Sequence, residues 1–134
     1  MVTFIKKYWK SSLITIVILV ISFINPPELP EISGFTFGTD KIIHILMYLA
    51  LAAVMLFEHF VIYGKTRTLR YWLLCGGFPA FLGIFTEVCQ EAFLPTRSFD
   101  WDDLIANFIG IIIAFLFSKI IFKISQTKSW LTKI

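Results

Sequence analysis

The polar and ionisable residues that are candidates for catalysis or ligand binding lie mostly in three apolar stretches, at spacings typical of one helix face. The three sets are Lys41, His44 and Tyr48; Glu87, Gln90 and Glu91; and Asp100, Asp103, Asn107 and Gly110. Residues three or four positions apart lie on the same side of a helix. Because an ionisable side chain in contact with lipid is costly, we expect each set to face other helices.

His44 and Glu87 are the candidates for acid–base catalysis. A histidine changes its charge near neutral pH, and a neighbouring carboxylate favours its protonated form. The alternative is a histidine that makes only hydrogen bonds between helices.

Arg97 and Lys41 are candidates for binding a phosphate or carboxylate, the arginine through two parallel N–H donors. In an alternative interpretation, Arg97 pairs with Asp100 or Asp103 and fixes a loop. Gln90 and Asn107 suit hydrogen bonding between helices. The complete predicted ligand-binding set is Asp40, Lys41, Gln90, Arg97, Asp100, Asp103 and Asn107.

The same region contains residues of the types that bind divalent metals. Glu87, Asp100 and Asp103 together with His44 would be suitable ligands. However, they are spread over separate helices and form no compact motif such as HExxH. We therefore predict neither a metal nor any other cofactor.

The elements that carry these residues are predicted to be transmembrane helices. Of the 134 residues 57% are hydrophobic and only 16% are charged, whereas a soluble domain has about a quarter charged residues. Four apolar blocks, at about 9–25, 40–63, 71–94 and 101–122, approach the roughly 20 residues that cross a bilayer. Ser98 or Asp100 is expected to cap the last helix. The prediction is an all-α four-helix transmembrane bundle forming a single domain, residues 1–134.

The charges predict how this bundle is oriented in the cell membrane. Ten of the 12 Lys and Arg residues fall in the N-terminal segment, the middle loop and the C-terminal tail. Eight of the nine Asp and Glu residues fall on the other side. Since basic residues stay cytoplasmic, both termini should be cytoplasmic. Glu58 and His59, at the inner end of the second block, are interpreted as solvated interfacial residues, and the inner halves of the helices as otherwise apolar.

These motifs together resemble the VanZ-like family of small bacterial membrane proteins. The family pattern is Asp-Lys-x-x-His, then Glu-x-x-Gln, then an Arg followed by Phe-Asp-x-x-Asp-x-x-x-Asn-x-x-Gly. The matching residues here are Asp40, Lys41, His44, Glu87, Gln90, Arg97, Asp100, Asp103, Asn107 and Gly110. The resemblance covers about residues 38–117. The family's namesake is an accessory factor in teicoplanin resistance, but many relatives have no link to resistance, so resistance is not carried over to this chain.

Two functions remain open at this point. In the first, an outward-facing polar pocket binds, and could process, an anionic membrane lipid or lipid-linked envelope precursor. In the second, the polar cluster only holds the helices of a non-catalytic accessory protein together. A proton-coupled transporter fits less well, because its polar path should cross the apolar inner halves. The net charge of +3 follows from membrane topology, and we predict no nucleic-acid partner.

Overall fold

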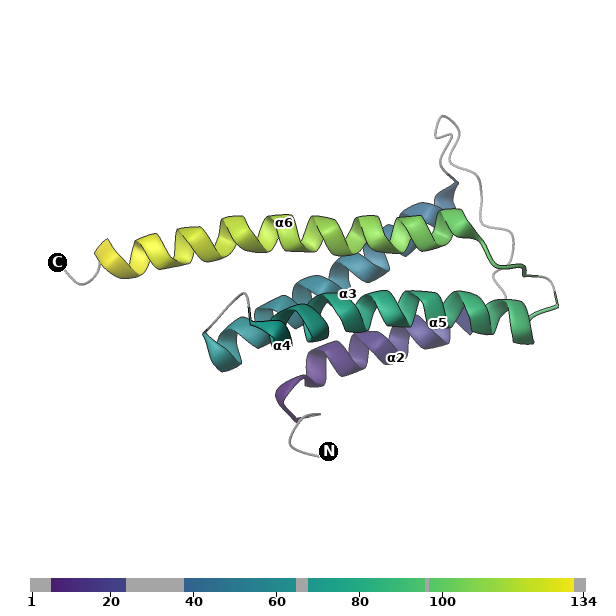
Figure 1. Cartoon of the computed structure of the whole chain (residues 1–134), viewed down its shortest axis with the longest axis horizontal. Coiled ribbons are helices and arrows are strands. Elements are labelled where there is room, and N and C mark those ends of the chain that lie inside the picture. Colours follow the sequence, from purple (N-terminus) through teal and green to yellow (C-terminus); the bar gives the residue numbers. More distant parts are fainter. Residues whose placement is uncertain (1–5, 24–37, 65–67, 96, 132–134) are drawn as a thin grey trace.

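The computed structural model describes residues 6–23, 38–64, 68–95 and 97–131, with side chains as far as residue 122. Within these ranges the chain is helical and contains no strand. The elements are α2 (Trp9–Phe23), α3 (Thr39–Tyr63), α4 (Leu69–Trp72), η1 (Leu73–Gly77), α5 (Phe78–Phe93) and α6 (Trp101–Leu131). Because α4, η1 and α5 run on continuously, the described chain forms four helical segments, as predicted (Figure 1).

Three of these segments are long and apolar enough to cross a membrane: Thr39–Tyr63, Leu69–Phe93 and Trp101–Phe122. The first helix, α2, has only 15 described residues, about 22 Å of helix against the roughly 30 Å of a bilayer core. Positions 24 and 25 of the predicted first block lie outside the described residues. Many large apolar side chains are exposed on the bundle surface, for example Phe81, Val61 and Leu116, as expected of helices that face lipid.

Helix α3 is the centre of the bundle and packs against α2, η1, α5 and α6. Its buried face combines apolar and polar residues: His44, Tyr48, Leu51, Ala52, Met55, Leu56, Glu58 and His59. We call the end at which α3 and α6 begin and α5 stops the site end. The terminal end is the opposite one, where α2 begins and α3 stops. In Figure 1 the yellow end of α6 points away from the site end.

The contact between α3 and α6 is the most extensive in the fold, and a stripe of small residues makes it possible. Ala106, Gly110 and Ala114 lie four positions apart on α6 and are buried. A Cβ atom at Gly110 would lie 2.4 Å from the Ile45 carbonyl oxygen and 2.9 Å from the Leu49 nitrogen. Only glycine therefore lets the two backbones approach this closely.

The third transmembrane segment, predicted at about 71–94, runs from Leu69 to Phe93. It contains a π-helical turn, Leu73–Gly77, two residues before Pro79. Proline has no N–H to donate to the carbonyl four residues earlier, and its ring clashes with that carbonyl. Widening the preceding turn relieves the clash, and the flexible pair Gly76 and Gly77 permits it.

Candidate functional site

The centre of the site is an ammonium group held between two carboxylates. Lys41, in the first turn of α3, lies 3.1 Å from Asp100 Oδ2 and 2.9 Å from Asp103 Oδ1. Asp100 precedes α6, and Asp103 is in its first turn. Asp100 also accepts a hydrogen bond of 2.8 Å from the Asp102 amide, and so caps α6 as predicted. The start of α6 is thereby fixed against the start of α3.

His44 lies one turn deeper in α3, and both of its ring nitrogens face α6. Nδ1 is 3.0 Å from Asn107 Oδ1, and since an amide oxygen only accepts hydrogen bonds, Nδ1 is the donor. Nε2 is 3.7 Å from Asp103 Oδ2. His44, Asp103 and Asn107 are 4%, 4% and 1% exposed. The ring is therefore held in one orientation by buried groups.

Glu87 reaches the same region from α5 and is 1% exposed. Its Oε2 is 3.5 Å from the Asp100 amide nitrogen, a long contact. Its Oε1 is fully buried and has no hydrogen-bond partner among the described residues, and the same is true of Asn107 Nδ2. Such groups are rare in folded proteins and usually indicate a bound water, an ion or a functional role.

Further hydrogen bonds tie the remaining helices to the site. Gln90 donates from Nε2 to the Ser22 carbonyl at 2.8 Å, joining α5 to the end of α2. The Tyr48 hydroxyl lies 3.1 Å from Thr86 Oγ1, joining α3 to α5. All four helical segments thus meet at the site end.

A small pocket of about 50 Å³ opens beside His44. Its polar lining comes from Ser22, Asp40, His44, Gln90 and Arg97. Arg97 is half-buried, and no described carboxylate lies within ion-pair distance of it. The alternative pairing of Arg97 with Asp100 or Asp103 is therefore wrong, because Lys41 holds both carboxylates.

The pKa of Asp100, which lies outside the membrane-spanning segments, is lowered from its ordinary value. Partial burial acts to raise this pKa, but the Asp102 amide and the Lys41 ammonium together outweigh that effect. Asp100 consequently remains ionised at neutral pH and keeps its ion pair with Lys41.

The predicted site residues all lie at the site end, namely Asp40, Lys41, His44, Glu87, Gln90, Arg97, Asp100, Asp103 and Asn107. Glu91, which belongs to the same helix-face set as Glu87 and Gln90 but was not a predicted site residue, does not join them. It was expected to share the buried face of Glu87 and Gln90, but it is exposed. Around the helix Gln90 lies about 60° to one side of Glu87 and Glu91 about 40° to the other side, so a packed face centred between Glu87 and Gln90 leaves Glu91 at its edge.

A second polar cluster, at the terminal end, contradicts the interpretation of Glu58 and His59 as solvated. They are 6% and 1% exposed. Glu58 accepts hydrogen bonds from the Lys10 amide at 3.0 Å and from the Ser11 hydroxyl. His59 Nδ1 bonds to the Tyr8 hydroxyl at 3.0 Å. Tyr8 and Ser11 thus join Glu58 and His59 in a buried polar cluster at the terminal end.

The sequence did contain a signal for this second cluster. Tyr8, Ser11, Ile18 and Ser22, all buried, follow one another at intervals of three, seven and four residues, from just before the first apolar block into it. Small polar residues at such spacing are typical of helix–helix contacts in membranes.

Comparison with protein-family models places the chain in a family. The family model described as VanZ/LLP1 matches residues 1–123. Neither the curated proteins nor the solved structures contain a match to this chain. The family match covers the first three helical segments and α6 as far as residue 123, and it includes every residue of the site. The fold, the motifs and this match together show that the chain is a membrane protein belonging to the VanZ/LLP1 family.

Proposed function

We propose that this protein binds the phosphate group of a membrane lipid or lipid-linked envelope precursor at the site end, which faces the outside of the cell. The observation that carries the proposal is the position of Arg97. It lines the pocket next to His44 and Gln90, and no described carboxylate neutralises it. A guanidinium available in this way suits a phosphate, which accepts two parallel hydrogen bonds.

The size and place of the pocket support a headgroup ligand. About 50 Å³ has room for only a few water-sized groups, so phosphate oxygens enter it while the remainder of the ligand stays outside. The pocket lies where α2 ends and α3 begins, the depth at which a headgroup meets a helix end. His44 lines it, and Glu87 lies on α5 three residues before Gln90, which also lines it. These two residues would transfer protons if the ligand is processed.

A second function, as a non-catalytic accessory protein, is favoured by a different observation. Lys41, Asp100, Asp103, His44 and Asn107 form a continuous network between α3 and α6. Such a network joins helices firmly without any ligand. If the protein has only this accessory function, the arginine substitutions described in the next paragraph will not change the binding of phosphate-containing lipids.

The test compares two substitutions that each remove one arginine charge, Arg97→Gln and Arg70→Gln. Arg70 lies in α4 at the terminal end, over the ring of Tyr63. Each protein is reconstituted in nanodiscs of phosphatidylcholine and titrated with short-chain phosphatidylglycerol in one arm and polyprenyl diphosphate in the other. We expect R97Q to weaken binding of at least one of them tenfold or more, and R70Q to leave it unchanged.

The outcomes separate the two functions and the two ligand sources. Preference for the diphosphate assigns the site to lipid-linked precursors, and preference for phosphatidylglycerol assigns it to bulk lipid. Equal effects of R97Q and R70Q, or no binding of either ligand by a folded protein, would overturn the proposal in favour of the accessory function.

A further inference from the structure

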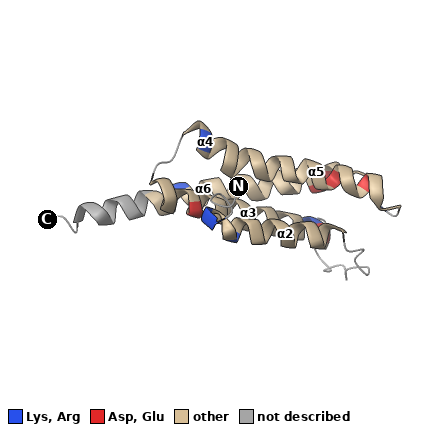
Figure 2. Ribbon diagram, turned by 90° about the horizontal axis from the view of Figure 1, so that it is seen from below, with Lys and Arg blue, Asp and Glu red and all other residues tan. Residues whose placement is uncertain are grey.

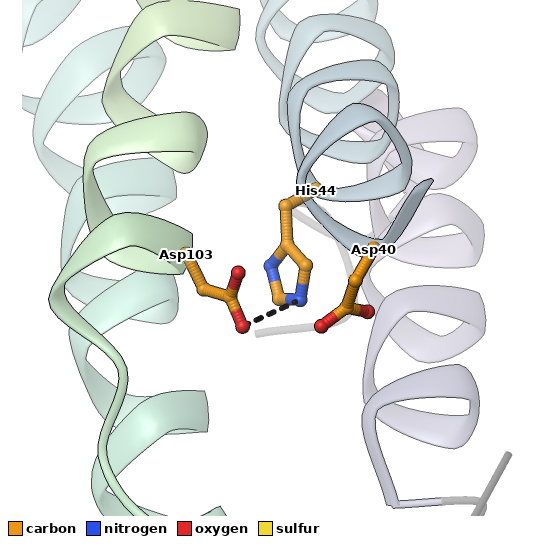
Figure 3. A group of neighbouring side chains, drawn as sticks. All are labelled: Asp40, His44 and Asp103. Atoms are coloured by element: carbon orange, nitrogen blue, oxygen red, sulfur yellow. Dashed lines mark ion pairs between the residues drawn. The ribbon is translucent and has the colours of Figure 1, made fainter. Parts of the chain in front are cut away.

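We propose that Asp40, His44 and Asp103 bind a divalent transition-metal ion, most suitably Zn²⁺, beside the pocket. One ligand atom from each of these residues can be chosen so that all three lie within 4.8 Å of one another. Figure 3 shows the His44 ring between the carboxylates of Asp40, on its own helix, and Asp103, on α6. The sequence offered Glu87, Asp100 and Asp103 with His44 as ligand types but predicted no metal. In the structure Asp103 of that set lies with His44, and Asp40 is the third member of the group.

The orientation of His44 is the one that a metal ligand requires. Its Nδ1 donates to Asn107 Oδ1, so the lone pair is on Nε2, the nitrogen that faces the carboxylates. A histidine bound to a metal almost always donates its other N–H to such an acceptor. Asn107 is thus a positioning residue for the proposed ligand.

The separation between His44 and Asp103 also fits a shared ion. His44 Nε2 and Asp103 Oδ2 are 3.7 Å apart, too far for a hydrogen bond. Two ligands of one zinc ion, each about 2.1 Å from it, lie roughly 3.4 Å apart. Small side-chain rotations would bring both atoms to that distance. The second oxygen of Asp103 remains with Lys41.

Glu87 supplies an independent indication of a cation. Its Oε1 is buried and has no partner among the described residues, and its other oxygen faces the Asp100 amide at the start of α6. The site end therefore gathers four carboxylates, those of Asp40, Glu87, Asp100 and Asp103, around two basic side chains, Lys41 and Arg97. One divalent ion would balance this excess of negative charge.

The donor set indicates the class of metal. One imidazole nitrogen with carboxylate oxygens suits zinc and its neighbours in the transition series better than Ca²⁺, which prefers six or more oxygens. Three protein ligands leave a coordination position open, and Asp40 and His44 line the pocket. A ligand from the pocket could occupy that position. This last consequence rests on the proposed function, whereas the metal site itself does not.

The experiment uses the full-length protein in detergent and Co²⁺ as a spectroscopic substitute for Zn²⁺. We expect one equivalent of Co²⁺ to produce visible absorption bands, and Zn²⁺ to abolish them by displacement. Asp40→Asn should weaken Co²⁺ binding at least tenfold. Asp102→Asn is the matched control, because Asp102 is exposed at the start of α6 and should leave binding unchanged. Asn107→Ala should lower affinity tenfold to a hundredfold through the loss of His44 orientation.

The proposal is overturned if folded wild-type protein binds neither Co²⁺ nor Zn²⁺ stoichiometrically, or if D40N and D102N bind the metal equally well. Asp40 is half-buried at the start of α3, so its amide variant should fold, and a circular dichroism spectrum checks this. The readout is independent of lipid. If the protein binds metal but its phosphate binding does not depend on Arg97, only the proposed function is refuted. If it binds no stoichiometric metal but still binds phosphate in the presence of a chelator, only the metal site is refuted.

Discussion

At the scale of single residues, the protein is defined by polar side chains buried in the bundle. His44, Glu87, Gln90, Asp103 and Asn107 are each less than 5% exposed. Most of them have partners from another helix, as burial of polar groups requires. Glu58 and Glu91 show that two carboxylates of the same chain differ widely in burial. Glu58 is buried and hydrogen-bonded to α2, whereas Glu91 is exposed.

Lys41 is the residue whose loss should destabilise the site end most. Lys41→Met would leave Asp103, whose side chain is 6% exposed, as a buried charge without its ammonium partner. We expect the free energy of unfolding to fall by about 2–3 kcal/mol, somewhat less than the roughly 3–5 kcal/mol for breaking a fully buried ion pair, because the Lys41 side chain is 18% exposed. The measurement is thermal unfolding in detergent.

Lys10→Met is the control for this prediction. Lys10 is exposed and lies over the rings of Trp9 and Phe57. An exposed contact of this kind contributes only about 0.5–1 kcal/mol. If both variants melted at the same temperature, the ion pairs of Lys41 would contribute no more to stability than an exposed cation–π contact, which would contradict the prediction.

At the scale of helices, two glycine-dependent features set the geometry. Gly110 allows α6 to approach α3, and that contact brings Asp103 and Asn107 to His44. The π-helical turn at Leu73–Gly77 changes the direction in which the following residues of the third segment face. Glu87, Gln90 and Thr86 all follow this turn, so their position against α3 depends on it.

Gly110→Ala should separate α3 from α6. The added methyl group would lie 2.4 Å from the Ile45 carbonyl oxygen. Because this oxygen belongs to the backbone of α3, it cannot rotate out of the way as the end of a flexible side chain can. We expect a loss of about 1–3 kcal/mol in stability, the range for overpacking, together with weaker binding at the site. Thermal unfolding and the metal titration measure these two effects.

Gly77→Ala provides the comparison, since a Cβ atom there would meet only the Trp72 carbonyl oxygen, at an ordinary 3.8 Å. Its effect should be clearly smaller. Gly110→Ala protein with wild-type stability and binding would show that the α3–α6 contact can shift without consequence.

At the scale of the whole molecule, the two polar clusters lie at opposite ends of one bundle. The site end holds most of the acidic residues, and Figure 2 shows the acidic residues of α5 away from the basic residue of α4. Lys7, Lys10 and Arg70 lie at the terminal end, over the rings of Tyr63, Trp9 and Phe57. This arrangement agrees with the charge bias on which the predicted orientation rests.

We predict that both termini are cytoplasmic. Green fluorescent protein fused to either end should fluoresce, and alkaline phosphatase fused to either end should be inactive, because the first requires the cytoplasm and the second an oxidising exterior. Phosphatase inserted between Pro95 and Asp100 should be active. Active phosphatase at the C-terminus would place the site end in the cytoplasm and exclude an outer-leaflet ligand.

The sequence by itself determined the membrane class, the four helical segments and the residues of the site. These follow from local properties: apolar length, charge bias and spacings of three and four along a helix. The family motifs pointed to the same residues, and the match over residues 1–123 confirmed the family.

Only the tertiary structure decided which of these residues touch. In the structure Asp100 and Asp103 pair with Lys41, and Arg97 lines the pocket. The spacing of residues along one helix does not show which of the two basic side chains pairs with these aspartates. The tertiary structure also buries Glu58 and His59 because the start of α2 packs against the end of α3, a contact between positions about fifty residues apart in the chain. Pairings of this kind depend on how helices cross, and the crossing depends on close backbone approaches such as the one at Gly110.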